Sequence, residues 1–173
     1  MKNIMVLILS IFLTNSTNAQ DKHILPLQDG KVKYTDIIHV DSVSKIELYK
    51  RAKLWLVDSY KSCTNVIQLD DNENGVIIGK GFFEEDMCKL GCEHIIVWQV
   101  IKIQIKDGRY KFEFSDFRIK PLYPEKLTSL PTYDEPIEEW NENKSFYSNV
   151  DAKVKALIES LNKAMKTHID DNW

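Results

Sequence analysis

Three cysteines are the residues of this chain whose type and spacing best suit a chemical role. Cys88 and Cys92 are separated by Lys89-Leu90-Gly91 and lie between two β-rich runs. In an oxidising compartment, two cysteines this close, with a glycine between them, can close a loop disulfide. We therefore predict a Cys88–Cys92 disulfide, and we interpret Cys63 as a buried free thiol, since lone cysteines often pack as small hydrophobes.

The same cysteines allow two alternatives. With Cys63 and His94 they would form a Cys3His set, whose Cys-x3-Cys-x-His core is similar to zinc ligation. Secreted thiols tend to oxidise, which favours the disulfide over a metal site. A redox-active pair is disfavoured because such pairs usually have the form Cys-x-x-Cys at a helix start. We expect no metal ligand and no cofactor.

No other group of residues has the pattern of a catalytic site. Glu84-Glu85-Asp86 offers paired carboxylates for acid–base work or for a cation, but three consecutive acids at a strand end are usually a solvated turn. Gly79-Lys80-Gly81 precedes no helix, so close backbone packing or a bulge explains its glycines better than phosphate binding. The histidines are dispersed, without the i, i+4 spacing of a helical metal-binding face: His23, His39, His94 and His168. We predict no catalytic residue.

Length and composition indicate one packed globular domain. The 173 residues are 43% hydrophobic and 28% charged, which is ordinary for a globular chain. The formal net charge of −3 offers no electrostatic reason to bind nucleic acid or an anionic membrane. Three cysteines are also too few for a disulfide scaffold.

The first nineteen residues are typical of a secretory signal peptide. Lys2 is followed by an apolar run from Ile4 to Leu13, and the small residues Thr17 and Ala19 suit positions −3 and −1 of a cleavage site. The apolar run is too short to span a bilayer. No cysteine precedes Cys63, so a lipid-modified N-terminal cysteine is not available. We expect a secreted or periplasmic, Gram-negative envelope protein without stable membrane insertion after signal removal.

The remaining chain, residues 20–173, predicts a single α+β domain. An alternating run over 31–40 indicates a strand, and a capping box at Ser44 and Glu47 begins an amphipathic helix that ends near Tyr60. Two hairpins follow. The first joins 66–69 to 76–83 through Asn-Gly, and the second joins 95–106 to 109–119 through Asp-Gly.

The second hairpin predicts its own register. A two-residue turn places Ile103 opposite Phe112 and Ile101 opposite Phe114 on one face. Continued at the same spacing, the pairing puts Trp98 opposite Phe117 on the other face.

Residues 121–149 hold aromatic and acidic residues and show neither the two-residue alternation of a strand nor the periodicity of a helix. Long irregular segments in compact domains are often functional, and aromatic residues anchor interfaces. The alternative is that these aromatics pack over the open sheet face or an edge. We predict partner or ligand contacts at five residues: Tyr123, Tyr133, Trp140, Phe146 and Tyr147. A C-terminal amphipathic helix is predicted over 150–169, capped near Ser148 or Asn149.

Three stretches together resemble a known family. They are Leu48-Tyr49-Lys50-Arg51-Ala52-Lys53-Leu54-Trp55-Leu56, Val66-Ile67-Gln68-Leu69-Asp70-Asp71 and Gly75-Val76-Ile77-Ile78-Gly79-Lys80-Gly81. The chain from about residue 30 to 120 resembles a secreted bacterial family of unknown function with a TATA-box-binding-protein-like (TBP-like) fold. The resemblance implies a curved antiparallel sheet with helices packed on one face. The residues themselves predict the element order β-α-β-β-β-β-α. The resemblance implies no catalytic or ligand-binding residue, and a shared fold does not fix a function.

The sequence thus predicts a core over 30–120, the acidic and aromatic segment 121–149 and the C-terminal helix. We interpret the protein as a non-enzymatic module that binds a protein or small ligand in the cell envelope. One alternative is a hydrolase-like enzyme that uses Glu84, Glu85 or Asp86 near a histidine. Another is an assembly subunit that pairs through an edge strand.

Overall fold

The computed structural model describes residues 24–60, 66–88, 92–121, 134–140 and 144–168. The elements in these ranges are β1 (Leu27–Gln28), β2 (Lys31–Val32), β3 (Tyr34–His39), α1 (Lys45–Ser59), β4 (Ile67–Asp71), β5 (Val76–Cys88), β6 (Cys92–Lys106), β7 (Arg109–Pro121), β8 (Glu135–Pro136) and α2 (Lys144–Lys166). The predicted order of strand, helix, four strands and helix is present, and β1, β2 and β8 are short additions to it.

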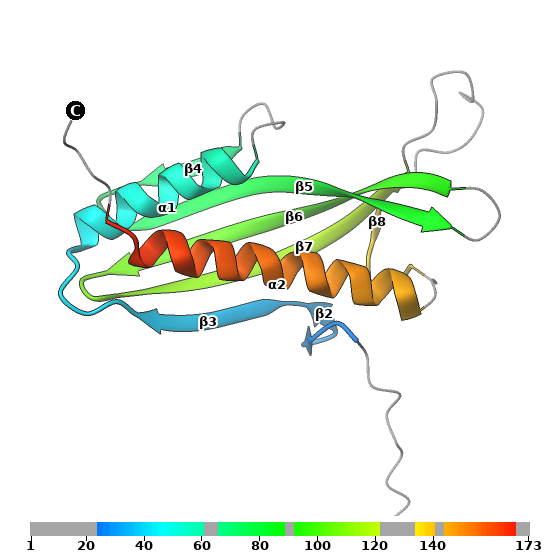
Figure 1. The fold of residues 1–173 in the computed structure, drawn as a ribbon, viewed down its shortest axis with the longest axis horizontal. Coiled ribbons are helices and arrows are strands. Elements are labelled where there is room, and N and C mark those ends of the chain that lie inside the picture. The colour runs from blue at the N-terminus through cyan, green and yellow to red at the C-terminus, as the bar shows by residue number, and fades with distance from the viewer. Residues whose placement is uncertain (1–23, 61–65, 89–91, 122–133, 141–143, 169–173) are drawn as a thin grey trace, which may run out of the picture.

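One antiparallel sheet organises the described part of the chain. Its strand order is β3-β7-β6-β5-β4, and β8 pairs with the outer edge of β7, while β1 and β2 form a separate hairpin. Both helices lie across the same face of the sheet (Figure 1). The predicted two-layer α+β architecture is confirmed.

The first helix is positioned by its cap and by two glycines of β5. The Ser44 hydroxyl accepts a hydrogen bond from the backbone N–H of Glu47 at 3.3 Å, as the predicted cap requires. A Cβ added at Gly79 would approach Leu56 to 2.9 Å, and one added at Gly81 would lie 2.3 Å from the Tyr60 ring. The glycines therefore let α1 approach the sheet closely, as predicted.

The second hairpin confirms the predicted register near its turn and departs from it farther along. Ile103 faces Phe112 and Ile101 faces Phe114. Beyond Val100 the pairing shifts, so that Trp98 faces Arg118 and not Phe117. A bulge causes this change: Asp116 takes a left-handed backbone (φ 50°), and β7 gains one residue relative to β6. Phe117 consequently lies in the core beneath the helices, with 1% of its surface exposed.

The C-terminal helix begins six residues before its predicted start, at Lys144 and not at Val150. Phe146 lies four residues before Val150 and extends the same buried stripe toward the N-terminus. The stripe then runs through residues that are fully buried against the sheet and α1: Val150, Val154, Leu161 and Met165. Within the described residues, neither helix is long and apolar enough to cross a membrane.

Candidate functional site

The two faces of the sheet differ in character. The helix-covered face carries fully buried side chains such as Ile77, Ile103 and Phe114. Neither helix covers the opposite face (Figure 1). We call this the open face. Its residues on the three central strands follow from the register: Val76, Ile78, Lys80, Phe82 and Glu84 on β5; Ile96, Trp98, Val100, Lys102, Gln104 and Lys106 on β6; Arg109, Lys111, Glu113, Ser115, Arg118 and Lys120 on β7.

An apolar strip runs along the open face. It consists of Val76, Ile78, Phe82, Ile96, Trp98 and Val100, all partly buried. At its centre Phe82 and Trp98 are cross-strand partners with ring centroids 4.8 Å apart. The Lys80 ammonium lies 5.3 Å from the centroid of the Trp98 ring, which is within cation–π distance. The strip is therefore an aromatic and aliphatic surface with a cation, Lys80, in contact with one of its rings.

Cations border the strip on both sides. Lys80 is the cross-strand partner of Val100, while Arg118 and Lys120 face Trp98 and Ile96 from β7. The open face as defined above holds seven cations and two acids, Glu84 and Glu113. Most of these cations have no ion-pair partner among the described residues; Arg118 is the exception, since it pairs with Asp134 at 2.8 Å. The face is thus basic although the chain as a whole carries a charge of −3.

A depression of about 310 Å³ lies at the end of the open face nearest the β6–β7 turn. Its lining includes the apolar Ile37 and Val76, the amides of Asn74 and Gln104, and three cations, Lys106, Arg109 and Lys111. No acid is among its lining residues. A depression of this size takes one or two side chains or a small anion.

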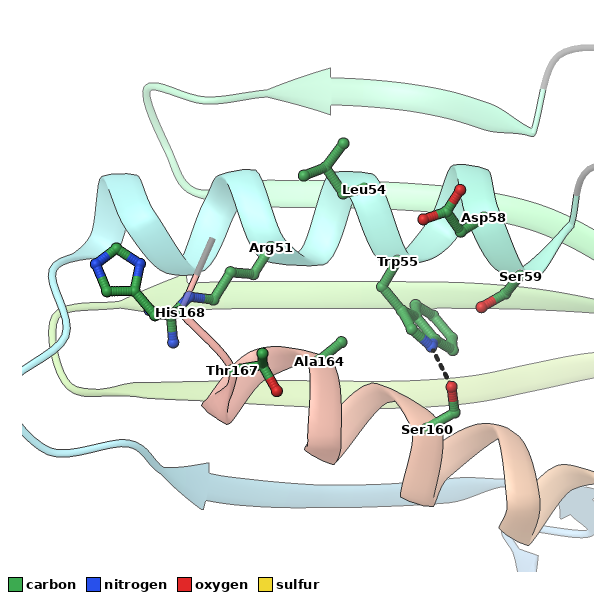
Figure 2. A pocket seen from close by; sticks show the side chains of 9 residues that line it. All are labelled: Arg51, Leu54, Trp55, Asp58, Ser59, Ser160, Ala164, Thr167 and His168. Carbon is green, nitrogen blue, oxygen red and sulfur yellow. Dashed lines mark hydrogen bonds between the residues drawn. The ribbon is translucent and has the colours of Figure 1, made fainter. Parts of the chain in front are cut away.

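A second, larger hollow lies on the other side of the molecule, between α1 and α2. Figure 2 shows this groove of about 470 Å³, to which both helices contribute polar side chains. The Trp55 indole N–H donates to the Ser160 hydroxyl at 3.1 Å across the groove. Because this bond ties the two helices together, it gives both residues a structural role.

The groove also holds Arg51, a charged residue of α1 that is only 6% exposed. Its Nε donates to Glu47 at 2.8 Å, and a terminal nitrogen donates to the backbone oxygen of Met165 at 2.7 Å. Arg51 thus neutralises the C-terminal end of α2. The His168 Nδ1 lies 3.9 Å from the same Glu47 carboxylate. These contacts fasten helix ends and do not assemble a nucleophile beside a base.

Perturbed pKa values mark further structural contacts. Burial and a 2.9 Å hydrogen bond to Asp151 raise the pKa of Tyr34. Hydrogen bonds from Lys53 and from Tyr49 hold the pKa of Asp70 below its usual range. Each of these pairs joins a helix to a strand or to a strand end, so the shifts accompany packing of the two layers.

The predicted cysteine pair lies at the end of the β5–β6 hairpin. The backbone register makes Cys88 and Cys92 direct cross-strand partners. Opposed residues in an antiparallel pair have Cα atoms roughly 4.5–5.5 Å apart, which is within the span of a disulfide. The bond stays a prediction, and Cys63 lies outside the described residues. Among described side chains, no cluster of three His, Cys, Asp or Glu is arranged to hold a metal ion.

The acidic run at the same hairpin is not one site. Glu85 is 5% exposed on the helix-covered side, where it accepts from the Asn149 amide at 2.8 Å and pairs with the Lys153 ammonium at 2.7 Å. Glu84 is exposed and points to the opposite side of the strand. The register pairs Asp86 with His94. Within this acidic run, Glu85 therefore has a structural role, because it links β5 to α2.

The structure places three of the five predicted contact aromatics against the core. Phe146 is 3% exposed, which corrects its assignment to an irregular segment with a contact role: as part of α2 it is inaccessible to a partner. Trp140 and Tyr147 are partly buried against the core, and the Tyr147 hydroxyl donates to the Trp140 backbone oxygen. Tyr123 and Tyr133, like the signal segment, lie outside the described residues.

A protein family described as "domain of unknown function (DUF4468) with TBP-like fold" matches residues 34–120, from β3 through most of β7. The chain belongs to this family. The match covers the strands of the open face and α1, and it leaves α2 outside. No match is found among curated proteins.

Two crystal structures share the fold. A DUF4468 family protein from Bacteroides ovatus ATCC 8483 is 19% identical, with a TM-score of 0.65 over 87% of this chain and 94% of that one. A TBP-like protein from Parabacteroides distasonis ATCC 8503 is 20% identical, with a TM-score of 0.63 over 84% of this chain and 99% of that one. The fold therefore extends over the helix that the family match omits.

The open face is the feature that sequence reasoning missed. Its cations are separated along the chain by buried residues and by acids in the turns, so a charge count shows no basic region. The signal was present in the alternation itself. From Lys102 to Lys111 the positions that face away from the core are repeatedly basic or amide-bearing.

Proposed function

We propose that the chain is a secreted or periplasmic, non-enzymatic module that binds a protein or small ligand of the cell envelope through its open face. The observation that carries the proposal is an apolar strip on a face whose cations, Arg118 excepted, form no ion pair with a described residue. Covering partly exposed apolar surface of this kind with a partner removes it from water, which favours binding. The signal-like first nineteen residues support an envelope location.

The open face suits binding better than the groove between the helices does. In the groove, Trp55, Ser160 and Arg51 already satisfy one another or the helix ends. On the open face, Lys102, Lys106 and Lys111 form no ion pair with any described residue. A partner can therefore supply interactions that the fold itself does not use.

Site-specific photo-cross-linking in the native host tests the surface. A photoreactive amino acid at position 102, on the open face, should form an adduct in the envelope fraction. The same amino acid at position 50, on the exposed side of α1, should form none. Val100→Glu should abolish the adduct, because it places a charge in the apolar strip, while Val57→Glu on α1 should leave it intact. Equal adducts from both positions would contradict the proposal.

The location has its own test. The envelope fraction should contain a chain whose N-terminal residue is Gln20, measured by mass spectrometry. A chain retaining Met1 in the cytoplasm would contradict a secreted module.

A further inference from the structure

The depression beside the β6–β7 turn holds a concentration of positive charge. Lys106 and Arg109 are direct cross-strand partners at the turn, and Lys111 is the next residue of β7 on the same face. Neighbours of this kind place their Cβ atoms roughly 5–7 Å apart. None of the three forms an ion pair with a described residue. Their mutual repulsion therefore favours a bound anion.

Acids near this cluster already have partners. Glu113, the next open-face residue of β7 after Lys111, lies 3.8 Å from the Lys33 ammonium. Asp107, in the turn itself, accepts a hydrogen bond from the backbone N–H of Lys45 at 2.7 Å and so holds the start of α1. Asp71, at the end of β4, accepts from the backbone N–H and the side-chain amide of Asn74. The two amides that line the depression, Asn74 and Gln104, add donors and no charge. An anion entering from solvent thus meets donors on several sides.

The rest of the depression is apolar. Ile37 from β3, one of its lining residues, is 54% exposed, and Val76 belongs both to this lining and to the apolar strip. A group that combines a negative charge with a short apolar stem fits this arrangement, as the side chain of a glutamate does. The adjoining strip would then receive the apolar neighbours of that residue.

The open face favours a polypeptide over a nucleic acid. Four of the six strip residues are aliphatic, and the two aromatic rings pack against each other with Lys80 over one of them. Base stacking needs free aromatic faces. Acidic residues interleaved with apolar ones match both the cations and the aliphatic strip.

We propose that the depression binds carboxylates of an acidic polypeptide whose apolar side chains lie along the strip. This rests on the proposed function of the open face and names its partner class. The partner then binds at two places: its carboxylates at the β6–β7 turn and its apolar side chains at the centre of the sheet.

Binding of defined polymers to the purified chain tests this. The probes are a random glutamate–tyrosine copolymer, poly-glutamate, heparin and a single-stranded oligonucleotide, measured by fluorescence anisotropy. The copolymer should bind most tightly, and its affinity should fall as salt rises from about 50 to about 300 mM. Tighter binding of heparin or of the oligonucleotide would overturn the partner class, and failure of the copolymer to bind would overturn the proposal.

Charge-matched variants locate the site. Lys106→Gln/Arg109→Gln/Lys111→Gln should weaken copolymer binding by roughly tenfold or more, because charge-assisted hydrogen bonds are strong polar contacts. Lys50→Gln/Lys163→Gln/Lys166→Gln, which removes three exposed helix cations, should change it by less than about twofold, as expected of charges remote from the site. Equal losses in both variants would overturn the site. Thermal unfolding of each variant confirms that it folds.

The two proposals can fail separately. If the native adduct at position 102 survives the turn triple variant but is lost in Val100→Glu, the open face binds its partner without the depression and this inference is wrong. If Val100→Glu also keeps the adduct, the proposed function is wrong as well.

Discussion

The two faces of the central sheet are built from the same strands but differ in burial and charge. On the helix-covered face, side chains such as Phe114 and Ile103 are fully buried, and even Gln99, at 0% exposure, donates to the Tyr60 hydroxyl at 2.8 Å. On the open face, cations lie beside partly exposed apolar residues and most lack protein partners in the described structure. The difference indicates that the first face carries the stability of the fold, whereas the second is available for binding.

The largest expected effect compares one residue type on the two faces. Ile103→Ala should lower the free energy of unfolding by about 2–5 kcal/mol, since it opens a cavity under the helices. Ile78→Ala, on the partly buried strip, should lower it by less, about 1–2 kcal/mol, because no helix covers the side chain and the site does not leave a closed cavity. Urea unfolding measures both. Similar losses from the two variants would show that the open face is covered in the folded protein.

A smaller effect tests the close approach of α1 to the helix-covered face. Gly81→Ala should destabilise the fold by about 1–3 kcal/mol, because the new Cβ would collide with the Tyr60 ring. A double-mutant cycle with Tyr60→Ala isolates that collision. The double variant should be less destabilised than the sum of the single variants, and strict additivity would argue against the contact.

The end of the β5–β6 hairpin gives a third comparison, between oxidised and reduced protein. Closure of so short a loop by Cys88–Cys92 contributes up to about 2 kcal/mol in the loop-entropy account. Reduction should lower stability by no more than that amount and should leave copolymer binding at the distant β6–β7 turn unchanged. Alkylation of unfolded, unreduced protein followed by intact mass should find one free thiol, and three would rule the bond out.

The smallest effect contrasts a paired lysine near the helices with an unpaired one on the open face. The pKa of Asp70 is lowered in the folded protein, chiefly by its hydrogen bond to Lys53. The contribution of Asp70 to the free energy of unfolding is therefore present above its ordinary pKa near 3.8. It is lost as the pH falls through the lower pKa that Asp70 has in the folded protein. For so exposed a pair it is no more than about 1 kcal/mol.

Lys53→Met should accordingly lower the melting temperature at neutral pH, and the difference from the unmodified chain should shrink as Asp70 becomes protonated. Lys102→Met serves as the control and should show no such convergence. Parallel curves for Lys53→Met across this pH range would contradict the assigned ion pair.

Local patterns predicted those parts of the fold that depend on near neighbours. The capping serine, the Asp-Gly turn and the glycines beneath α1 are read from a few consecutive residues, and the structure confirms each. The early start of α2 was missed because Phe146 was read with the aromatic segment and not with the stripe it continues.

The candidate site was predictable only in part, because its charge is assembled from three strands. Lys80, Lys102 and Arg118 are far apart in sequence and converge through sheet pairing alone. The position of Trp98 relative to Arg118 also depends on a bulge that leaves no residue signature as clear as Asn-Gly or Asp-Gly. Strand pairing and bulges depend on tertiary structure, which explains why the sequence pattern pointed instead to the irregular, aromatic residues 121–149.

The bulge at Asp116 acts as a change of parity within β7. Before it, even-numbered residues from Tyr110 to Phe114 enter the core; after it, the odd-numbered Phe117 and Ile119 do so. One strand therefore carries two alternation phases. If β7 continued through Asp116 without the bulge, Arg118 and Lys120 would point toward the helices, and Phe117 and Ile119 would point away from the core. The bulge thus sets two things at once: which cations of β7 lie on the open face, and which of its side chains enter the core.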